Sequence, residues 1–425
     1  MIKRDEYLNK LINRIGNDSI KIITGIRRVG KSYLINEILY EYLLTNVTDE
    51  KHIIRFSFDS AIDLEKIDED LVEIQVEKRK VNYKKFIKYI NSLIVDENKY
   101  FLLLDEVQLL DHFEFVLNGY LSRKQFEIFV TGSNSKFLSS DVLTEFRGRG
   151  DEIHVMPLNF KEYYEYTKLD YDTAIHQYLV YGGLPRVVLS STNEEKNKYL
   201  LTQLERTYLT DIIDRNRIKN DDELEELLDI IASGISSLTN PKKLSDTFNS
   251  IKKLSLTDDT IKKYIEYFKD AYMIDIARRF DIKGKKYIST PYKIYFEDIG
   301  IRNARLNFRQ IEETHLMENL IYNELKNRGY NVDVGVVEIR ENNIRKNLEV
   351  DFVVNNGSKR YYIQSAYRIP DSEKMQQELK SFGIIKDSFK KVLIVMDNIV
   401  PRHDENGYLF ISLKDFLLEN NILEY

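Results

Sequence analysis

The first 160 residues contain short apolar runs separated by stretches with helical spacing. Residues 21–24, 100–104 and 126–131 are apolar runs of strand length, and HIIRFSFD at 52–59 lies between the first two. The segment YLINEILYEYLL, which follows residue 32, repeats its apolar residues at helical spacing instead. Short apolar runs that alternate with helices are typical of parallel strands buried on both faces. The pattern predicts an α/β fold in which helices cover both faces of a parallel sheet.

The pattern changes after Pro157, where helical spacing dominates. YLVYGGLPRVV at 178–188 is a sharp glycine–proline break within this region, of the kind that most often forms a loop. Three further helical patterns begin at residue 222, and an alternating stretch with its tip near residue 284 follows them. Three helices followed by a hairpin predict a winged helix.

Length and composition narrow the classes of protein to consider. A chain of 425 residues is too long for a single ordinary core, so its length alone predicts two or three domains. The absence of cysteine excludes disulfides, thiolate zinc sites and a cysteine nucleophile. The six histidines are far apart, so we expect no histidine-based metal site. A net charge of -6 means that contact with nucleic acid would require a local basic patch.

The sequence also gives an expectation for location. It has no apolar run of roughly 18 residues, the length that spans a bilayer. Its start, MIKRDEYLNKLINRI, mixes charged and apolar residues at helical spacing and lacks the continuous apolar core of a secretory signal. We therefore expect a cytoplasmic protein with no membrane partner.

A glycine-bounded basic loop, GIRRVGKS, joins the first apolar run to the following helix. Glycines let backbone amides close around phosphates, and the positive end of the helix points toward them. Strand, loop and helix together predict a P-loop, in which Lys31 contacts the β- and γ-phosphates of ATP and Ser32 binds Mg2+. The predicted cofactor-binding residues are Gly25, Ile26, Arg27, Arg28, Val29, Gly30, Lys31, Ser32 and Tyr33.

Polar residues end the next two apolar runs. KYFLLLDEVQ places Asp105 and Glu106 at the end of a strand, which matches the Walker B arrangement of P-loop ATPases. We expect Asp105 to hold Mg2+ through water and Glu106 to polarise the attacking water. FEIFVTGSNSKFL places Asn134 after the following strand. Asn134 is the predicted contact to the γ-phosphate or the attacking water, with Ser133 as its rival and a plain turn as the structural alternative.

Two arginines, Arg147 and Arg149, lie in LTEFRGRGDEIHV between a helix and a further strand. A guanidinium at such a position stabilises charge on the γ-phosphate, either within its own subunit or across a subunit boundary. One of the two is the predicted catalytic arginine, with Arg149 favoured over Arg147. The alternative is an ordinary surface arginine beside a glycine.

The charges of the predicted winged helix argue against reading of DNA by its third helix. In TDDTIKKYIEYFKDAYMI, acidic side chains outweigh the lysines, which makes the helix a poor reader of a DNA groove. The hairpin that follows is basic and is either a weak phosphate contact or a solvated wing. Its basic residues are Arg278, Arg279, Lys283, Lys285, Lys286 and Lys293.

The last segment predicts a helix, HLMENLIYNELKNRGYNV, followed by the strands LEVDFVVNN and KRYYIQSAY. Glu318, Asp351 and Gln364 match the positions at which a PD-(D/E)XK nuclease core gathers magnesium. The lysine of that core should lie two residues after Gln364, where this chain has Ala366. Loss of the lysine and of one carboxylate weakens both metal binding and water activation.

Replacement residues are available in the same segment. Glu349 shares a strand face with Asp351 and is a candidate carboxylate, while Lys359 and Lys391 are candidate cations. We nevertheless favour a nuclease-like fold used for binding or assembly over an active nuclease.

Taken in order, these segments resemble a prokaryotic family of ATP-binding proteins, in which an AAA-type ATPase precedes a domain of unknown function. The motifs that carry the resemblance are GIRRVGKS, LLLDEVQ, TGSNSKFLS, FRGRG, YGGLPR, TIKKYIEYFKDAYMI and YFEDIGIRNA, with MENLIYNELKNRGY, VDFVV and YIQSAY near the end. The resemblance implies a winged helix and a nuclease-like end. It also implies that Gly183 and Pro185 form the Gly-x-Pro element that related signal-transduction ATPases place against the adenine.

We therefore expect four domains. They are a P-loop ATPase domain at 1–160, a helical lid or linker at 161–221, a winged-helix domain at 222–305 and a PD-(D/E)XK nuclease-like domain at 306–425. The favoured function is an ATP-hydrolysing switch whose nucleotide state controls domain arrangement or assembly. The alternatives are ATP-dependent processing of nucleic acid and a nucleotide-binding scaffold without turnover. Expected partners are ATP or ADP with Mg2+, a second copy of the chain, an unidentified protein and, weakly, nucleic acid.

Overall fold

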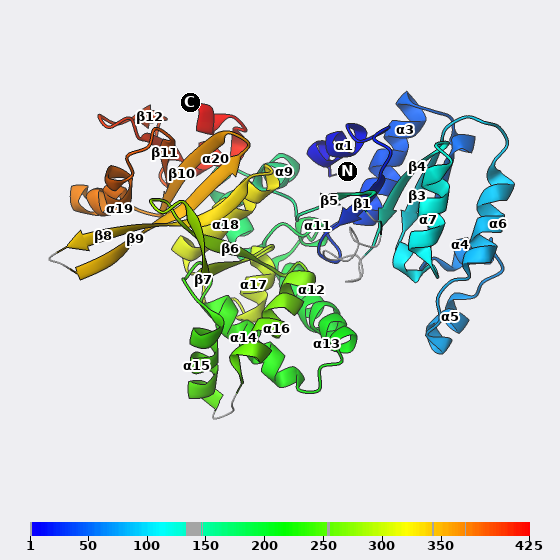
Figure 1. The fold of residues 1–425 in the computed structure, drawn as a ribbon, viewed down its shortest axis with the longest axis horizontal. Coiled ribbons are helices and arrows are strands. Elements are labelled where there is room, and N and C mark those ends of the chain that lie inside the picture. Colours follow the sequence, from blue (N-terminus) through cyan, green and yellow to red (C-terminus); the bar gives the residue numbers. More distant parts are fainter. Residues whose placement is uncertain (1, 133–145, 147, 253–255, 342–343, 370) are drawn as a thin grey trace. The chain divides into compact units, whose positions relative to one another are not determined.

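The computed structural model describes residues 2–132, 146, 148–252, 256–341, 344–369 and 371–425 (Figure 1). The chain forms two compact units. The first comprises Met1–Met156 and Asp270–Tyr272, and the second comprises Pro157–Lys269 and Met273–Tyr425. No helix within these described ranges is long and apolar enough to cross a membrane.

The first unit is built on a five-stranded parallel sheet with the strand order β2-β3-β4-β1-β5. Its strands are β1 (Ile20–Thr24), β2 (Ile53–Ser57), β3 (Tyr100–Asp105), β4 (Phe126–Thr131) and β5 (Gly150–His154). Every residue of β1, β3 and β4 is buried, as expected of strands covered on both faces. The predicted α/β fold with a parallel central sheet is confirmed.

Helices connect the strands of this sheet. They are α1 (Asp5–Ile12), α2 (Lys31–Tyr33), η1 (Leu34–Leu39), α3 (Tyr40–Asn46), η2 (Glu50–His52), α4 (Ala61–Glu65), α5 (Leu71–Glu77), α6 (Tyr83–Leu93), η3 (Val107–Leu109) and α7 (Phe113–Ser122). The elements α2, η1 and α3 follow one another without a break and form the helix predicted after the glycine-bounded loop. Side chains of Phe56, Phe86, Leu102 and Ile128 meet in one apolar core between strands and helices.

Two charged side chains interrupt the apolar interior of this sheet. Lys21 on β1 and Glu127 on the neighbouring strand β4 form an ion pair, and both side chains are almost fully buried. Glu127 also accepts from Lys99 Nζ at 2.8 Å and from the Gly16 backbone N–H at 3.0 Å. Burial acts to raise the pKa of Glu127, but the hydrogen bonds from Lys21 and Lys99 outweigh it and lower the pKa below its ordinary value. The carboxylate is therefore charged at neutral pH.

The second unit combines helices with an eight-stranded mixed sheet of order β12-β13-β11-β10-β9-β8-β6-β7. Its helices are α9 (Phe160–Thr167), α10 (Tyr171–Tyr181), α11 (Pro185–Val188), α12 (Asn193–Gln203), η5 (Leu204–Leu209), α13 (Thr210–Asn216), α14 (Asp221–Ser233), α15 (Pro241–Lys252), α16 (Asp258–Asp270), α17 (Ile299–Arg305), α18 (Glu313–Asn327), α19 (Ser372–Ile384), α20 (Leu413–Leu418) and η6 (Ile422–Glu424). Its strands are β6 (Ile274–Asp281), β7 (Lys286–Phe296), β8 (Asn331–Glu341), β9 (Ile344–Asn356), β10 (Lys359–Ala366), β11 (Lys390–Val395), β12 (Arg402–His403) and β13 (Leu409–Ser412).

The hairpin predicted as a wing is formed by β6 and β7, and the three predicted helices before it are α14, α15 and α16. Thr239, which lies between α14 and α15, forms an isolated antiparallel bridge with Tyr292 of β7. The hairpin is not a free wing, however, because β6 also pairs in parallel with β8. An exposed strand edge gains backbone hydrogen bonds when it pairs with a neighbouring strand. As a result, one sheet contains strands from both sides of the predicted domain boundary at residue 305. The four domain ranges remain predictions.

The buried ion pair of the first sheet provides a stability test. We expect Lys21→Met to lower the free energy of unfolding by about 3 kcal/mol, because Glu127 then stays buried without its buried cation. Lys99→Met is the matched control: the Lys99 side chain is 48% exposed, and its loss should cost less than about 1 kcal/mol. Urea titration followed by circular dichroism measures both variants. Equal losses would contradict this account of the pair.

Candidate functional site

The backbone of the predicted P-loop depends on its two glycines. Gly25 has a φ of 136° and Gly30 a φ of 100°, conformations that residues with a side chain rarely adopt. A Cβ atom at Gly25 would also overlap the backbone carbonyl oxygen of Val155. Gly30 is the N-cap of α2, so the loop leads directly from β1 into the amino end of a helix. This is the strand, loop and helix arrangement that binds phosphate.

Lys31, the first residue of α2, reaches back over the loop. Its Nζ donates to the carbonyl oxygens of Gly25 at 2.8 Å and Ile26 at 3.2 Å, and the side chain is buried. The ammonium is thus held above a loop whose backbone amides suit an anion. A bound phosphate would replace these carbonyl contacts with stronger, charged ones.

Asp105, the last residue of β3, is a buried carboxylate at the same edge of the sheet. The Thr131 hydroxyl, at the end of β4, donates to Asp105, and Ser32 forms a second side-chain hydrogen bond with it. Burial raises the pKa of Asp105, and the two hydrogen bonds act in the opposite direction. The structure therefore brings together Ser32 and Asp105, which are 73 positions apart in the numbering (105 − 32).

Glu106 follows β3 in a left-handed backbone conformation, with a φ of 53°. This conformation is strained for a residue with a side chain and persists only where the surroundings hold it. Its N–H donates to Thr131 Oγ1 at 3.3 Å, and its carboxylate accepts from the side-chain amide of Gln108. The charge of Glu106 acts to raise the pKa of Asp105.

Thr131 is a site residue that the sequence analysis did not single out. It is fully buried and contacts both the Asp105 carboxylate and the Glu106 backbone. Its signal in the sequence is a hydroxyl at the end of a mainly apolar strand. That signal becomes specific only when β3 and β4 are known to be parallel neighbours.

Ser32 and Asp105 fit the protein's share of a Mg2+ site. In nucleotide sites Mg2+ keeps several waters and takes one or two side-chain ligands, while phosphates supply the rest. Across the described residues, no group of three or more His, Cys, Asp or Glu side chains forms a complete metal cage. The donor set therefore suits a metal ion that arrives together with a nucleotide.

The other predicted catalytic residues are only partly described. Asn134, its rival Ser133 and Arg147 lie outside the described residues, so their roles remain predictions. Arg149 is exposed, and its carbonyl oxygen accepts from the Ile20 N–H at 2.8 Å, where β1 begins.

The direction of the strands decides where Arg149 can act. Because β1 and β5 are parallel and paired from their first residues, Arg149 lies at the amino edge of the sheet, opposite the P-loop. A strand of five residues spans roughly 16 Å, farther than an arginine side chain extends. Of the two alternatives for Arg149, the contact within its own subunit does not fit the geometry. Action across a subunit boundary and the role of an ordinary surface arginine both remain as predictions.

Gly183 lies between α10 and α11 of the second unit, and Pro185 is the first residue of α11. The Asp298 carboxylate, at the N-cap of α17, accepts from the Gly183 N–H at 2.8 Å and from the Ile301 N–H at 3.0 Å. A Cβ at Gly182 would overlap this carboxylate. Burial raises the pKa of Asp298 to about 6, although backbone donors act against it. The glycines thus have a structural role within their own unit, and the contact of Gly183 and Pro185 with adenine remains a prediction.

A second group of charged side chains lies between β7, α18 and β9 of the second unit. Lys293 Nζ is 2.8 Å from Glu318 Oε1, 2.6 Å from Glu349 Oε1 and 3.7 Å from Asp351 Oδ1. Tyr295 donates to the same Glu318 oxygen at 2.7 Å. One ammonium therefore faces three carboxylates, two of which are the predicted acids of the nuclease-like core.

This cluster corrects two expectations. Lys293 is 3% exposed, so it does not belong to the basic surface of the hairpin. The cations expected to replace the missing lysine are elsewhere: Lys359 forms an ion pair near the chain end, and Lys391 donates to a backbone carbonyl. Both lie near the first residue of their strands, whereas Gln364 lies well inside β10.

Asp351 and Gln364 are adjacent, as predicted. Gln364 Oε1 accepts from the Asp351 backbone N–H at 2.6 Å. Ser365 donates to Asp351 Oδ2 from its N–H at 2.8 Å and from its hydroxyl at 3.0 Å. Ala366 is buried in a small apolar cluster, so nothing cationic comes from its position. The amide of Gln364 therefore binds backbone at the place where a carboxylate would bind metal.

The pKa values of Lys293 and Glu318 are both shifted within this cluster. Burial acts to lower the pKa of Lys293, but Glu318, Asp351 and Glu349 outweigh it and raise the pKa above its ordinary value. Burial raises the pKa of Glu318 to about 7, against the attraction of Lys293. The cluster thus contains its own counter-ion, and that counter-ion occupies the space between the three carboxylates.

Family models match two segments of the chain. Residues 17–164 match a model described as an AAA domain, and residues 172–312 match a model described as a domain of unknown function (DUF8612). The first segment contains the P-loop, Asp105, Glu106 and Thr131.

Relatives extend over nearly the whole chain. An uncharacterised protein of Haemophilus influenzae is 29% identical over 99% of both chains. An uncharacterised protein of Methanocaldococcus jannaschii is 28% identical over 98% of this chain and 88% of its own. Among solved structures, a Walker-type ATPase of Pyrococcus abyssi covers 72% of this chain and 96% of its own, with 18% identity and a TM-score of 0.46. By the family matches, residues 17–164 are similar to an AAA domain, and residues 172–312 are similar to a domain of unknown function.

Proposed function

We propose that this chain binds ATP with Mg2+, hydrolyses it and uses its nucleotide state to control domain arrangement or assembly. One observation carries the proposal. The parallel strands β1 and β3, with β4 between them, bring Lys31, Ser32, Asp105 and Glu106 to one edge of the first sheet. The AAA match over residues 17–164 supports it.

Each residue has a separate task in the proposed reaction. Lys31 and the amides at the start of α2 offset the negative charge of the β- and γ-phosphates. Ser32 and Asp105 hold Mg2+, which supplies further charge neutralisation on the phosphates when bound. Glu106 accepts a hydrogen bond from the attacking water and orients it. Thr131 fixes Asp105 and the Glu106 backbone in the required positions.

We further propose that assembly completes the site. Arg149 is exposed at the edge opposite its own P-loop, so it is available to a nucleotide bound by a second copy of the chain. Turnover would then require contact between copies, which links hydrolysis to assembly. Gly183 and Pro185 are the proposed contacts to the adenine.

Substitutions at Lys31 and Glu106 separate binding from hydrolysis. We expect Lys31→Ala to weaken ATP binding at least about 100-fold, because it removes the cation held over the loop. Glu106→Gln should keep binding and lower kcat at least about 100-fold, because an amide cannot accept the proton of the attacking water. Titration with a fluorescent ATP analogue and phosphate release measure the two effects. A Glu106→Gln protein with the native rate would refute the catalytic assignment.

Arg149 is tested by mixing variants. We expect Arg149→Ala to lower kcat at least about tenfold while ATP binding is kept. Lys31→Ala is inactive in its own site but still offers Arg149 to a partner. Mixing the two inactive proteins should therefore restore part of the activity, and wild-type specific activity should rise with protein concentration. Full activity of Arg149→Ala, or no recovery on mixing, would count against action across a subunit boundary.

The runner-up function is ATP-dependent cleavage of nucleic acid. Lys293 is the observation that favours it, because a cation does lie beside Glu318 and Asp351. That cation is paired with two carboxylates within 2.8 Å and buried between them, so it competes with a metal ion for the same oxygens. With Gln364 engaged by backbone as well, we propose that the cluster stabilises the fold and does not cleave phosphodiesters.

We therefore expect no nuclease activity from the nuclease-like segment, and Asp351→Ala is the control. Double-stranded DNA, single-stranded DNA and RNA should stay intact with Mg2+ or Mn2+, with or without ATP. The reason is that both metal and positioned water are required, and the loss of one such electrostatic contact typically costs about 10² to 10³ in rate. Gel assays on labelled substrates measure cleavage. Cleavage that disappears in Asp351→Ala would promote the nuclease function, whereas cleavage that survives this change would come from a contaminant.

A further inference from the structure

Gln108 is a buried glutamine two residues beyond Glu106, in the short helix η3. Its side-chain Nε2 donates to Glu106 Oε2, and the residue is only 7% exposed. Glutamine lies mostly on protein surfaces, because burial takes its amide group out of water. A buried glutamine that directs its amide to a neighbouring carboxylate therefore requires a reason.

The other half of the amide shows that simple packing is not the reason. Within the part of the chain that the structure describes, Gln108 Oε1 is buried and has no hydrogen-bond partner. An unpaired buried carbonyl oxygen costs stability. A methionine of similar length would fill the same space without that cost. The donor Nε2 is thus the useful part of this side chain, and its partner is Glu106.

The backbone that holds Gln108 is fixed at both ends of η3. Val107, the first residue of η3, and Leu110, its C-cap, are both fully buried in the apolar core of the first unit. Leu110 also forms a parallel bridge with Val81. The side chain of Gln108 therefore starts from a rigid base, so its amide reaches the Glu106 carboxylate from a defined direction.

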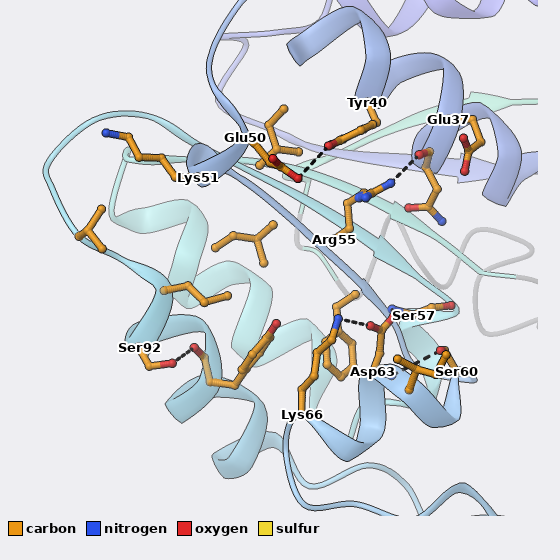
Figure 2. Close-up of a pocket in the computed structure, with 18 residues that line it drawn as sticks. Glu37, Tyr40, Glu50, Lys51, Arg55, Ser57, Ser60, Asp63, Lys66 and Ser92 are labelled. Atoms are coloured by element: carbon orange, nitrogen blue, oxygen red, sulfur yellow. Dashed lines mark hydrogen bonds and ion pairs between the residues drawn. The ribbon is translucent and has the colours of Figure 1, made fainter.

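The strand β2, which lies beside β3, ends with a residue whose donors are already engaged. Ser57 donates its N–H to the Asp63 carboxylate at 2.9 Å (Figure 2). Its hydroxyl donates to Asp59 Oδ1 at 2.7 Å. Ser57 therefore serves the segment that follows β2, whereas Gln108 directs its donor to Glu106.

We propose that Gln108 positions the base of the proposed ATP hydrolysis, on which this role depends. Its Nε2 holds one oxygen of the Glu106 carboxylate, so the carboxylate keeps a single orientation toward the attacking water. An amide suits this task because it is a donor without charge. A lysine or arginine at this position would form an ion pair with Glu106 and make the carboxylate a poorer proton acceptor.

The place of Gln108 also decides which kinetic parameter depends on it. Its contact is with Glu106, whereas ATP and Mg2+ are assigned to the P-loop, Ser32 and Asp105. Its loss should therefore lower the rate of the catalytic step and leave nucleotide binding unchanged. Because Gln108 acts through Glu106, its effect should disappear when the Glu106 carboxylate is absent.

The experiment is a double-mutant cycle in the full-length protein. We expect Gln108→Met, which removes the amide at similar length, to lower kcat at least about tenfold with unchanged affinity for a fluorescent ATP analogue. In a Glu106→Gln background, the same substitution should change the residual single-turnover rate less than about twofold. Gln125→Met is the matched control: Gln125 Nε2 donates to the Asp96 carbonyl at 2.7 Å, away from Glu106, and its loss should leave kcat unchanged.

Circular dichroism and thermal melting check the fold of each variant. If Gln108→Met does not fold, Gln108→Asn replaces it, because asparagine keeps a buried amide that ends one methylene short of the carboxylate, and kcat should again fall. An unchanged or raised kcat, a loss of ATP affinity, or an equal fall in the Glu106→Gln background would overturn the proposal. A native rate in Glu106→Gln alone would instead refute the catalytic role of Glu106 and with it the role of Gln108, so the two failures can be told apart.

Discussion

The chemistry of the first unit depends on the parallel register of three adjacent strands. β3 pairs in parallel with β4 from Tyr100 and Phe126, and β4 pairs in parallel with β1 from Ile128 and Ile20. This pairing brings the carboxyl ends of the three strands to one edge, where the P-loop, Asp105 and Thr131 meet. A shift of one residue between β3 and β4 would turn Asp105 to the other face of the sheet and separate it from Thr131. The same register places Arg149 at the opposite edge. One constraint therefore decides both which residues share the site and which one lies at the far edge of the sheet from it.

Buried polar pairs are well placed to specify that register. Lys21 and Glu127 pair across β1 and β4, while Asp105 and Thr131 pair across β3 and β4. A slipped register would leave a charge or a hydroxyl buried without its partner, which costs several kcal/mol for a charge and less for a hydroxyl. Apolar side chains alone would distinguish the registers less sharply, because one apolar residue substitutes for another with a small loss. We infer that the sheet's internal charges serve specificity as much as stability.

The sequence predicts what is encoded locally. The P-loop and the strand before it form one contiguous segment, and Asp105 and Glu106 are neighbours in another, so the sequence of each segment alone predicts its chemistry. The short apolar runs predict the parallel sheet. Thr131, Asp298 and Lys293 could not be assigned in this way, because each acts on residues brought close only by the fold. Lys293 looked like one of several basic residues in a hairpin. Lys293 is followed by Ile294 and Tyr295 in β7. It can be told apart from the other basic residues of the hairpin only once β7 is known to lie beside α18.

A short segment of the second unit concentrates such long-range polar contacts. Between Lys293 and Asn303 the chain contacts β9 and α18 through Lys293, the α10–α11 loop through Asp298, and α14 and α10 through Arg302 and Asn303. Each of these side chains is almost fully buried, so each contact restricts the position of a different element. Charges used in this way hold elements together and are not available to a substrate. The internal arrangement of the second unit therefore depends on these polar contacts as well as on its apolar cores.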